Sequence, residues 1–180
     1  MTAVSNAKVL WQFFFDMCLL KKNPQDLPDS TFLLQLLIVC NIAINFVINI
    51  ATTSLPVALA LSVLAVLLVY SFTRLLLWTL NFSSRSRKTL IAIFGTDLVI
   101  ALPAIGLRYW LHWLETHNLQ SDLAIILWIL VFIWNLLVTA HILRHALDKP
   151  FGVGVIASIG YTVIVFNVMY STHDWLVNLN

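Results

Sequence analysis

One acidic residue lies in the middle of an apolar run that is long enough to cross a bilayer. The stretch from 89 to 107 reads TLIAIFGTDLVIALPAIGL, and Asp97 is its only charged residue. A charge at the centre of a membrane costs at least about 2.5 kcal/mol, so such residues pair with a partner or act on something that crosses the membrane. Asp97 is therefore the first candidate for chemistry in this chain.

Arg74 is the residue that we expect to pair with Asp97. The polar stretch NFSSRSRK, residues 81–88, joins two apolar runs and predicts a helical hairpin whose loop centres near Ser84. Residues equally distant from that centre lie at similar depths; Arg74 precedes it by about ten residues and Asp97 follows it by about thirteen. Because pairing removes most of the cost of burying either charge, the pattern favours a structural ion pair. Contact with a partner subunit or lipid headgroup, and a proton or ion relay, are the alternatives.

Asparagines supply further polar groups at the same depth. Asn41, Asn45 and Asn49 recur at four-residue spacing, which stacks their amides on one helical face. Asn41 and Asn135 fall near the depth of Asp97 when each helix is measured from the same side of the membrane. Interhelical hydrogen bonds in membranes contribute about 0.6 kcal/mol each, so we expect a structural network, with a solvated permeation path as the alternative. The predicted intramembrane network comprises Arg74, Asp97, Asn41, Asn45 and Asn135.

Two histidines have the spacing that metal-binding helices use. In AHILRH, His141 and His145 are four residues apart and share one helical face. No acid or third ligand accompanies them, and Arg144 beside them marks a membrane interface. They are therefore weak metal candidates, and interfacial anchoring is the better interpretation. The sequence predicts no metal and no other cofactor.

The start of the last apolar run is rich in small residues. Gly152, Gly154 and Ser158 let another helix approach closely, because Gly154 and Ser158 have the small-xxx-small spacing of membrane helix interfaces. The approaching helix could belong to this chain or to a partner.

The composition defines the class of protein that must position these groups. Of 180 residues, 61% are hydrophobic and 10% are charged, and the mean hydropathy is +0.93. Soluble domains carry roughly 25% charged residues, so we expect a multi-pass membrane protein without room for a soluble catalytic or nucleotide-binding domain. A net charge of +2 does not favour nucleic acid as a partner. No Ser-His-Asp arrangement or glycine-rich phosphate loop stands out, so we expect no enzyme.

The elements that must hold these residues are helices. We expect an all-α bundle of five transmembrane helices, residues 23–180, preceded by an amphipathic helix at the cytoplasmic membrane surface, residues 1–22. Lys8, Gln12 and Asp16 form one polar stripe on that first helix, which suits an interface better than a crossing; a cleaved signal peptide is the alternative. The predicted spans are 31–50, 55–80, 89–107, 123–143 and 151–170.

The basic residues divide unevenly between the two sides of this arrangement. Nearly all lysines and arginines flank the spans on the side of the amino terminus, and Arg108 alone falls opposite. Loops on the cytoplasmic side carry the excess of Lys and Arg. We therefore expect a cytoplasmic amino terminus and an external carboxyl terminus in a cell inner (plasma) membrane.

Two stretches of the sequence resemble known membrane proteins. LKKNPQDLPDS, residues 20–30, is similar to the opening of small uncharacterised membrane proteins of Gram-negative bacteria. WNLLVTAHILRHALDKPFGVGVIASIGYTVIV, residues 134–165, resembles the last two spans of the Yip-type five-span family. That resemblance implies a five-span bundle with a non-catalytic role. The trafficking adaptors of the family carry a long soluble amino-terminal region that this sequence lacks, so their GTPase binding is not expected here.

Two functions follow from these patterns. The first is a small membrane scaffold or accessory subunit, which lies in the lipid bilayer and binds partner membrane proteins, lipid or a second copy of itself through its small-residue face and its amphipathic amino-terminal helix. The alternative is a small transporter or channel-like protein that uses Asp97 and the polar face of Asn41, Asn45 and Asn49.

Overall fold

The computed structural model describes residues 3–119 and 121–178, and these residues form helices without a strand. The predicted all-α fold is therefore confirmed. The long helices are α1 (Ala3–Cys18), α2 (Thr31–Asn49), α3 (Leu55–Thr79), α4 (Ser86–Thr116), α5 (Asp122–Leu147) and α6 (Phe151–Asn178), and the short 3₁₀ helices are η1 (Pro24–Asp26) and η2 (Ser83–Arg85).

Five of these helices, α2 to α6, are long and apolar enough to cross a membrane. All five begin within three residues of the predicted starts, but α4 continues to Thr116, well beyond the predicted end at 107. The aromatic segment after 107 contains no helix breaker, and a continuous helix satisfies the backbone without water. Pro103 lies inside α4, where it removes one backbone hydrogen bond.

The helix ends agree with local capping chemistry. The Ser30 hydroxyl accepts a hydrogen bond from the Leu33 N–H at 3.3 Å, and the Ser121 hydroxyl accepts one from the Ala124 N–H at 3.4 Å. Both serines are N-caps of spans, as hydroxyl residues commonly are. Asp148 ends α5 in the left-handed conformation, with φ of 55°, and so turns the chain into α6.

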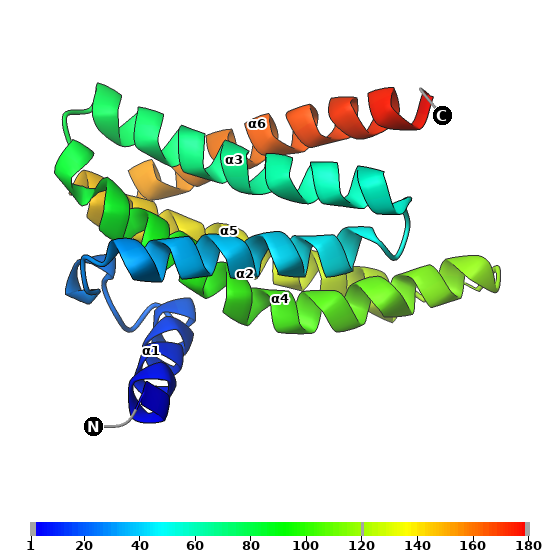
Figure 1. Cartoon of the computed structure of the whole chain (residues 1–180), viewed down its shortest axis with the longest axis horizontal. Helices are drawn as coiled ribbons and strands as arrows, with labels where there is room; N and C mark the ends of the chain where they lie inside the picture. The colour runs from blue at the N-terminus through cyan, green and yellow to red at the C-terminus, as the bar shows by residue number, and fades with distance from the viewer. Residues whose placement is uncertain (1–2, 120, 179–180) are drawn as a thin grey trace.

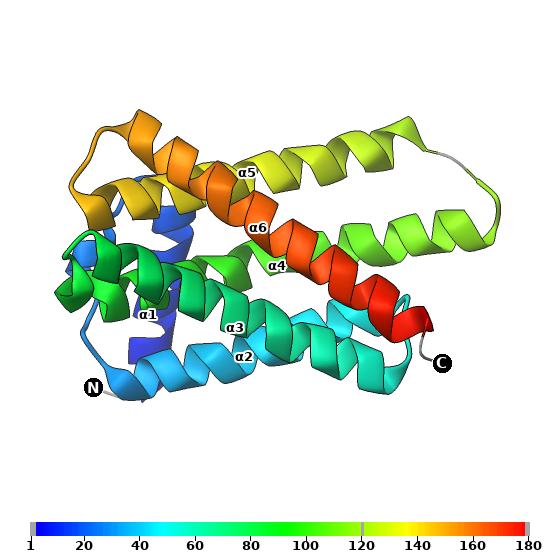
Figure 2. The same ribbon diagram turned by 90° about the horizontal axis from the view of Figure 1, so that it is seen from above.

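The five spans run side by side along the long axis of the molecule (Figures 1 and 2). One end, which we call the α1 end, carries η1, η2 and the turn between α5 and α6; the opposite end is the far end. Helix α4 packs against α1, α2, α3 and α5, and its residues 89–96 are all buried. Helix α6 contacts both α5 and α3, passing diagonally from one toward the other (Figure 2).

Helix α1 lies outside the spans near the α1 end and is steeply inclined to them (Figure 1). Its side chains Phe14, Met17 and Cys18 are buried, and the Phe14 ring occupies the space beside Gly95 of α4. The Trp134 indole of α5 donates a hydrogen bond to the Cys18 carbonyl at 2.9 Å. Helix α1 is therefore anchored to the bundle by specific packing.

The side of α1 that faces away from the bundle is mixed. Trp11 and Phe15 are exposed, and so are Lys8 and Gln12 of the predicted polar stripe. A helix of this kind presents an aromatic flank to lipid and a polar flank to headgroups and water.

Candidate binding pocket

A cavity of about 280 Å³ lies between the five spans. It is lined by residues 41–48 of α2 and 94–104 of α4, so it extends from the middle of the bundle toward the far end. Concave, mostly apolar pockets with a few convergent polar groups are the usual form of small-molecule sites. The polar side chains on its wall are Asn41, Asn45, Asp97, Asn135 and Tyr161, and the largest apolar ones are Phe94, Trp128 and Phe132.

Asp97 is the only charged residue on the wall of this cavity among the described residues. Its Oδ1 accepts a hydrogen bond from Asn135 Nδ2 at 3.2 Å, which bridges α4 and α5. No described residue donates to its second oxygen, Oδ2. A carboxylate has room for about four hydrogen bonds, so most of its accepting capacity is left for whatever enters the cavity.

The predicted ion pair between Arg74 and Asp97 is wrong. Among the described residues Arg87 pairs with Asp29, and His112 Nδ1 lies 3.8 Å from a carboxylate oxygen of Glu115. Arg74 is exposed, and its guanidinium carbon lies 5.7 Å from the centre of the Tyr70 ring. The hairpin argument gives similar depths for the two residues but says nothing about the direction in which each side chain points from its helix. Asp97 points into the bundle, whereas Arg74 points out of it.

The asparagines predicted on one face of α2 do face the bundle. The buried Asn41 amide donates to the carbonyls of Leu37 and Phe94, both at 2.9 Å, and so joins α2 to α4. Asn45 donates to the Asn41 carbonyl at 2.9 Å. Nearer the far end, the Asn49 amide donates to the Ser62 hydroxyl of α3 at 3.3 Å.

The structure thus brings together four of the five members of the predicted polar network. Asn41, Asn45, Asp97 and Asn135 line one cavity, but Asn135 alone of the described residues donates to Asp97. Asn41 donates to two backbone carbonyls and Asn45 to one, and neither donates to Asp97, so they line the wall without binding the carboxylate. Arg74 lies outside this network.

Two of the small residues of α6, Gly154 and Ser158, pack against α5 of the same chain. A side chain at Gly154 would collide with the Ala140 carbonyl and lie 2.9 Å from Cβ of Arg144, both on α5. Ser158 is buried and donates to the Leu136 carbonyl at 2.9 Å. Gly152 has open space around it. The close approach that the spacing predicts is therefore the contact between α6 and α5.

The two histidines of α5 lie at the α1 end, away from the cavity. The rings of His141 and His145 are 4.7 Å apart, and His141 Nε2 lies 3.1 Å from the Lys22 carbonyl oxygen. Gln25 donates to the His145 carbonyl at 3.1 Å. Among the described residues no third histidine, cysteine or acid joins the pair in a metal-binding group. Their observed contacts fasten residues 22–25 to the bundle.

The aromatic part of the cavity wall was not predicted. Trp128 resembles a member of an interfacial tryptophan belt, because it is only six residues from the start of α5. Tyr161 follows Ser158 by three residues on α6, which puts the two on one helical face. That spacing is the signal that could have placed Tyr161 inside the bundle.

No protein-family model matches the chain, and the curated proteins and solved structures with which it was compared gave no match either. The fold and the cavity define it as a multi-pass helical membrane protein with a mostly apolar central pocket that holds a few polar groups.

Proposed function

We propose that this chain is a small transporter-like membrane protein that binds a monovalent organic cation in the central pocket, with Asp97 as the counter-ion. The observation that carries the proposal is a carboxylate with an unused oxygen on the wall of a cavity that, among the described residues, no basic side chain lines. Buried charges persist when they are paired, and the part of the chain that the structure describes supplies no cation to this one. A ligand with a positive charge would complete the site.

The rest of the wall fits an organic cation better than a bare metal ion. Phe94, Trp128 and Phe132 offer aromatic surface, which attracts alkylammonium groups through the electrons of the ring. A volume of about 280 Å³ is near the lower limit of about 300 Å³ for ligand pockets. The pocket therefore suits a small amine with a short alkyl or single-ring body.

An accessory-subunit function, the first of the two expected from the sequence, has less support. The sequence based it on the small-residue face and the amphipathic amino-terminal helix. Gly154 and Ser158 are engaged with α5, and α1 packs its buried Phe14 against Gly95 of α4. The Yip-type resemblance supports a five-span, non-catalytic protein and names no ligand. The cell inner membrane remains our proposed location, with the α1 end in the cytoplasm.

Binding of benzyltrimethylammonium to the detergent-purified protein tests the proposal. We expect saturable quenching of tryptophan fluorescence, because Trp128 lines the pocket. Asp97→Asn should weaken binding by about tenfold or more, which corresponds to losing about 1.4 kcal/mol of attraction. The variant keeps the shape of the side chain, so the unfolding temperature without ligand should change little.

Asp122→Asn is the matched control, because Asp122 is an acid in the first turn of α5 that does not line the pocket. It should bind the probe like the wild type. Equal binding by Asp97→Asn and the wild type would contradict the role of Asp97. Uptake of the labelled probe into proteoliposomes then separates a transporter from a protein that only binds.

A further inference from the structure

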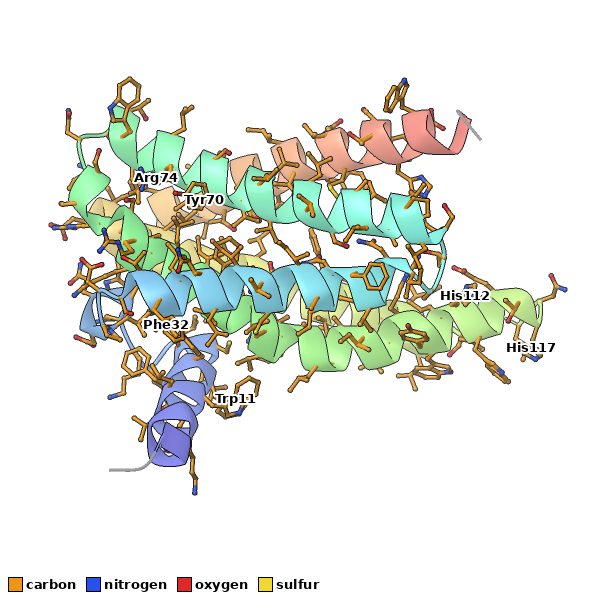
Figure 3. The ribbon with its side chains drawn as sticks, in the orientation of Figure 1. Trp11, Phe32, Tyr70, Arg74, His112 and His117 are labelled. Carbon is orange, nitrogen blue, oxygen red and sulfur yellow. The ribbon has the colours of Figure 1, made fainter. Side chains whose placement is uncertain are left out.

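A second hollow lies on the outside of the bundle at the α1 end, between α3 and the connection to α4. Its volume is about 450 Å³. Figure 3 shows Arg74 and Tyr70 side by side at this end of α3. The lining residues are Tyr70, Ser71, Arg74, Leu75, Trp78, Ser83 and Ser86.

The chemistry of this hollow is that of an anion site. Arg74 is its only charged residue, and no acid lines it among the described residues. The guanidinium carbon lies 5.7 Å from the centre of the Tyr70 ring, a cation–π contact that leaves the N–H groups free to donate. Ser83 and Trp78 add a hydroxyl and an indole N–H. A guanidinium fork beside further donors matches the oxygens of a phosphate.

The position of the hollow along α3 corresponds to the headgroup layer of a bilayer. Helix α3 has 25 residues, which span about 37 Å, whereas the hydrocarbon core is about 30 Å thick. Arg74 is five residues from the last residue of α3, Thr79, a rise of about 7.5 Å. Arginine reaches from such a depth to the membrane surface, and tryptophan favours the same layer.

We propose that this hollow binds the phosphodiester headgroup of an anionic phospholipid. Arg74 binds two phosphate oxygens, and Ser83 and Trp78 donate to the remaining oxygens. Leu75 and Trp78 are 64% and 68% exposed on the outer surface, so the acyl chains continue along apolar side chains that already face lipid. Inorganic phosphate shares the charge and the oxygens but lacks those chains, which is why the lipid is the better ligand.

Native mass spectrometry of the full chain in mild detergent tests this site. With phosphatidylglycerol added, we expect the wild type to retain one lipid per chain, and Arg74→Gln to bind it about tenfold more weakly, the loss of one charge-assisted contact. Phosphatidylcholine, which carries no net charge, should be retained less than phosphatidylglycerol by the wild type. Retention of phosphatidylglycerol by Arg74→Gln at the wild-type affinity would overturn the proposal.

Two matched arginine variants distinguish lipid binding at this hollow from nonspecific attraction of the lipid to surface charge. Arg87→Gln removes a charge at the same end that is paired with Asp29 at 3.0 Å, and Arg108→Gln removes one whose Nη2 donates to Thr52 Oγ1 at 2.9 Å. Both should retain the lipid. Equal losses from all three arginines would overturn the site in favour of diffuse attraction.

Inorganic phosphate is the competing ligand. Millimolar phosphate should not displace the lipid; displacement would assign the hollow to free phosphate and overturn the lipid proposal. If Arg74→Gln fails to fold, Ser83→Ala and Trp78→Phe carry the test, since each removes one donor from an exposed side chain. The unfolding temperature of every variant is measured without added lipid.

Discussion

At the scale of single residues, Asp97 and Arg74 are predicted to lie at similar depths in the membrane, but the structure keeps the two charges apart. Asp97 lies inside the bundle with Asn135 as its hydrogen-bond donor, and Arg74 lies outside against Tyr70. An arginine can reach headgroups from the end of a span, whereas a short aspartate cannot. The basic residue is therefore tolerated facing lipid, and the acidic residue must find its partner inside.

Cys18 gives a prediction at the same scale. Burial, with a contribution from the nearby Asp97 carboxylate, raises the pKa of the Cys18 thiol from 9.0 to about 12, and Sγ lies 3.7 Å from the Thr96 carbonyl oxygen. The thiolate is the reactive form, so Cys18 in a Cys40→Ser background should resist N-ethylmaleimide at pH 8. Unfolding in dodecyl sulfate should restore rapid labelling. Rapid labelling of the folded protein would contradict the packing of α1.

The same pKa shift predicts how stability depends on pH. The folded state holds the Cys18 proton more tightly than the unfolded state does, because the folded pKa lies above 9.0. Its contribution to stability is therefore complete below pH 9 and is lost as the pH rises toward about 12. Cys18→Ser in the Cys40→Ser background should remove this dependence from the alkaline unfolding curve.

The spacing of residues along a helix shows which of them share a face, and this sets how much of the central pocket the sequence predicts. Four-residue spacing correctly puts Asn41, Asn45 and Asn49 on a face that meets other helices. It cannot say which helix each face meets, because that depends on the order in which the spans pack. The Asp97–Asn135 contact and the inward position of Tyr161 depend on that order. Hence the polar residues were predictable, and their partners were not.

At the scale of the elements, the helices themselves were predictable because bilayer thickness fixes their length. The starts of α2, α3 and α6 coincide with the predicted residues. The long extension of α4 and the docking of α1 were not predicted. One of the contacts that dock α1, between the Phe14 ring and the missing side chain of Gly95, joins residues 81 positions apart in the sequence.

Gly95→Ala tests that docking. The added methyl group would overlap the Phe14 ring, so α1 must shift or Phe14 must leave its position. Overpacking of this kind costs about 1–3 kcal/mol, and we expect a lower unfolding temperature together with faster labelling of Cys18. Phe14→Ala combined with Gly95→Ala should recover part of the loss, because the two changes share one contact.

Gly106→Ala is the control on the same helix. A Cβ at this position meets nothing within 4 Å, and alanine favours a helix over glycine by about 0.8–1.0 kcal/mol. The change should leave the unfolding temperature equal or higher and should not expose Cys18. If Gly95→Ala and Gly106→Ala lowered the unfolding temperature equally, the effect of Gly95→Ala would come from α4 itself and not from its contact with α1.

At the scale of the whole molecule, most of the lysines and arginines of the described residues lie at the α1 end. Arg85 ends η2, Arg87 and Lys88 follow it at the start of α4, and Lys21 and Lys22 precede η1, all at the α1 end. The central pocket extends the other way, toward the far end. If the α1 end faces the cytoplasm, as the basic residues favour, the pocket of the proposed transporter lies nearer the outer surface and its ligand enters from outside.

The orientation is the last prediction. A reporter fused after Asn180 should be active only outside the cytoplasm, and one inserted at residues 81–85 only inside. A cytoplasmic carboxyl terminus would require an even number of crossings. Among the described helices only α1 could supply a sixth crossing, yet its 16 residues span about 24 Å, short of a hydrocarbon core of about 30 Å. Its packing across α4 through Phe14 also opposes a crossing, so such a result would contradict both the charge argument and the position of α1.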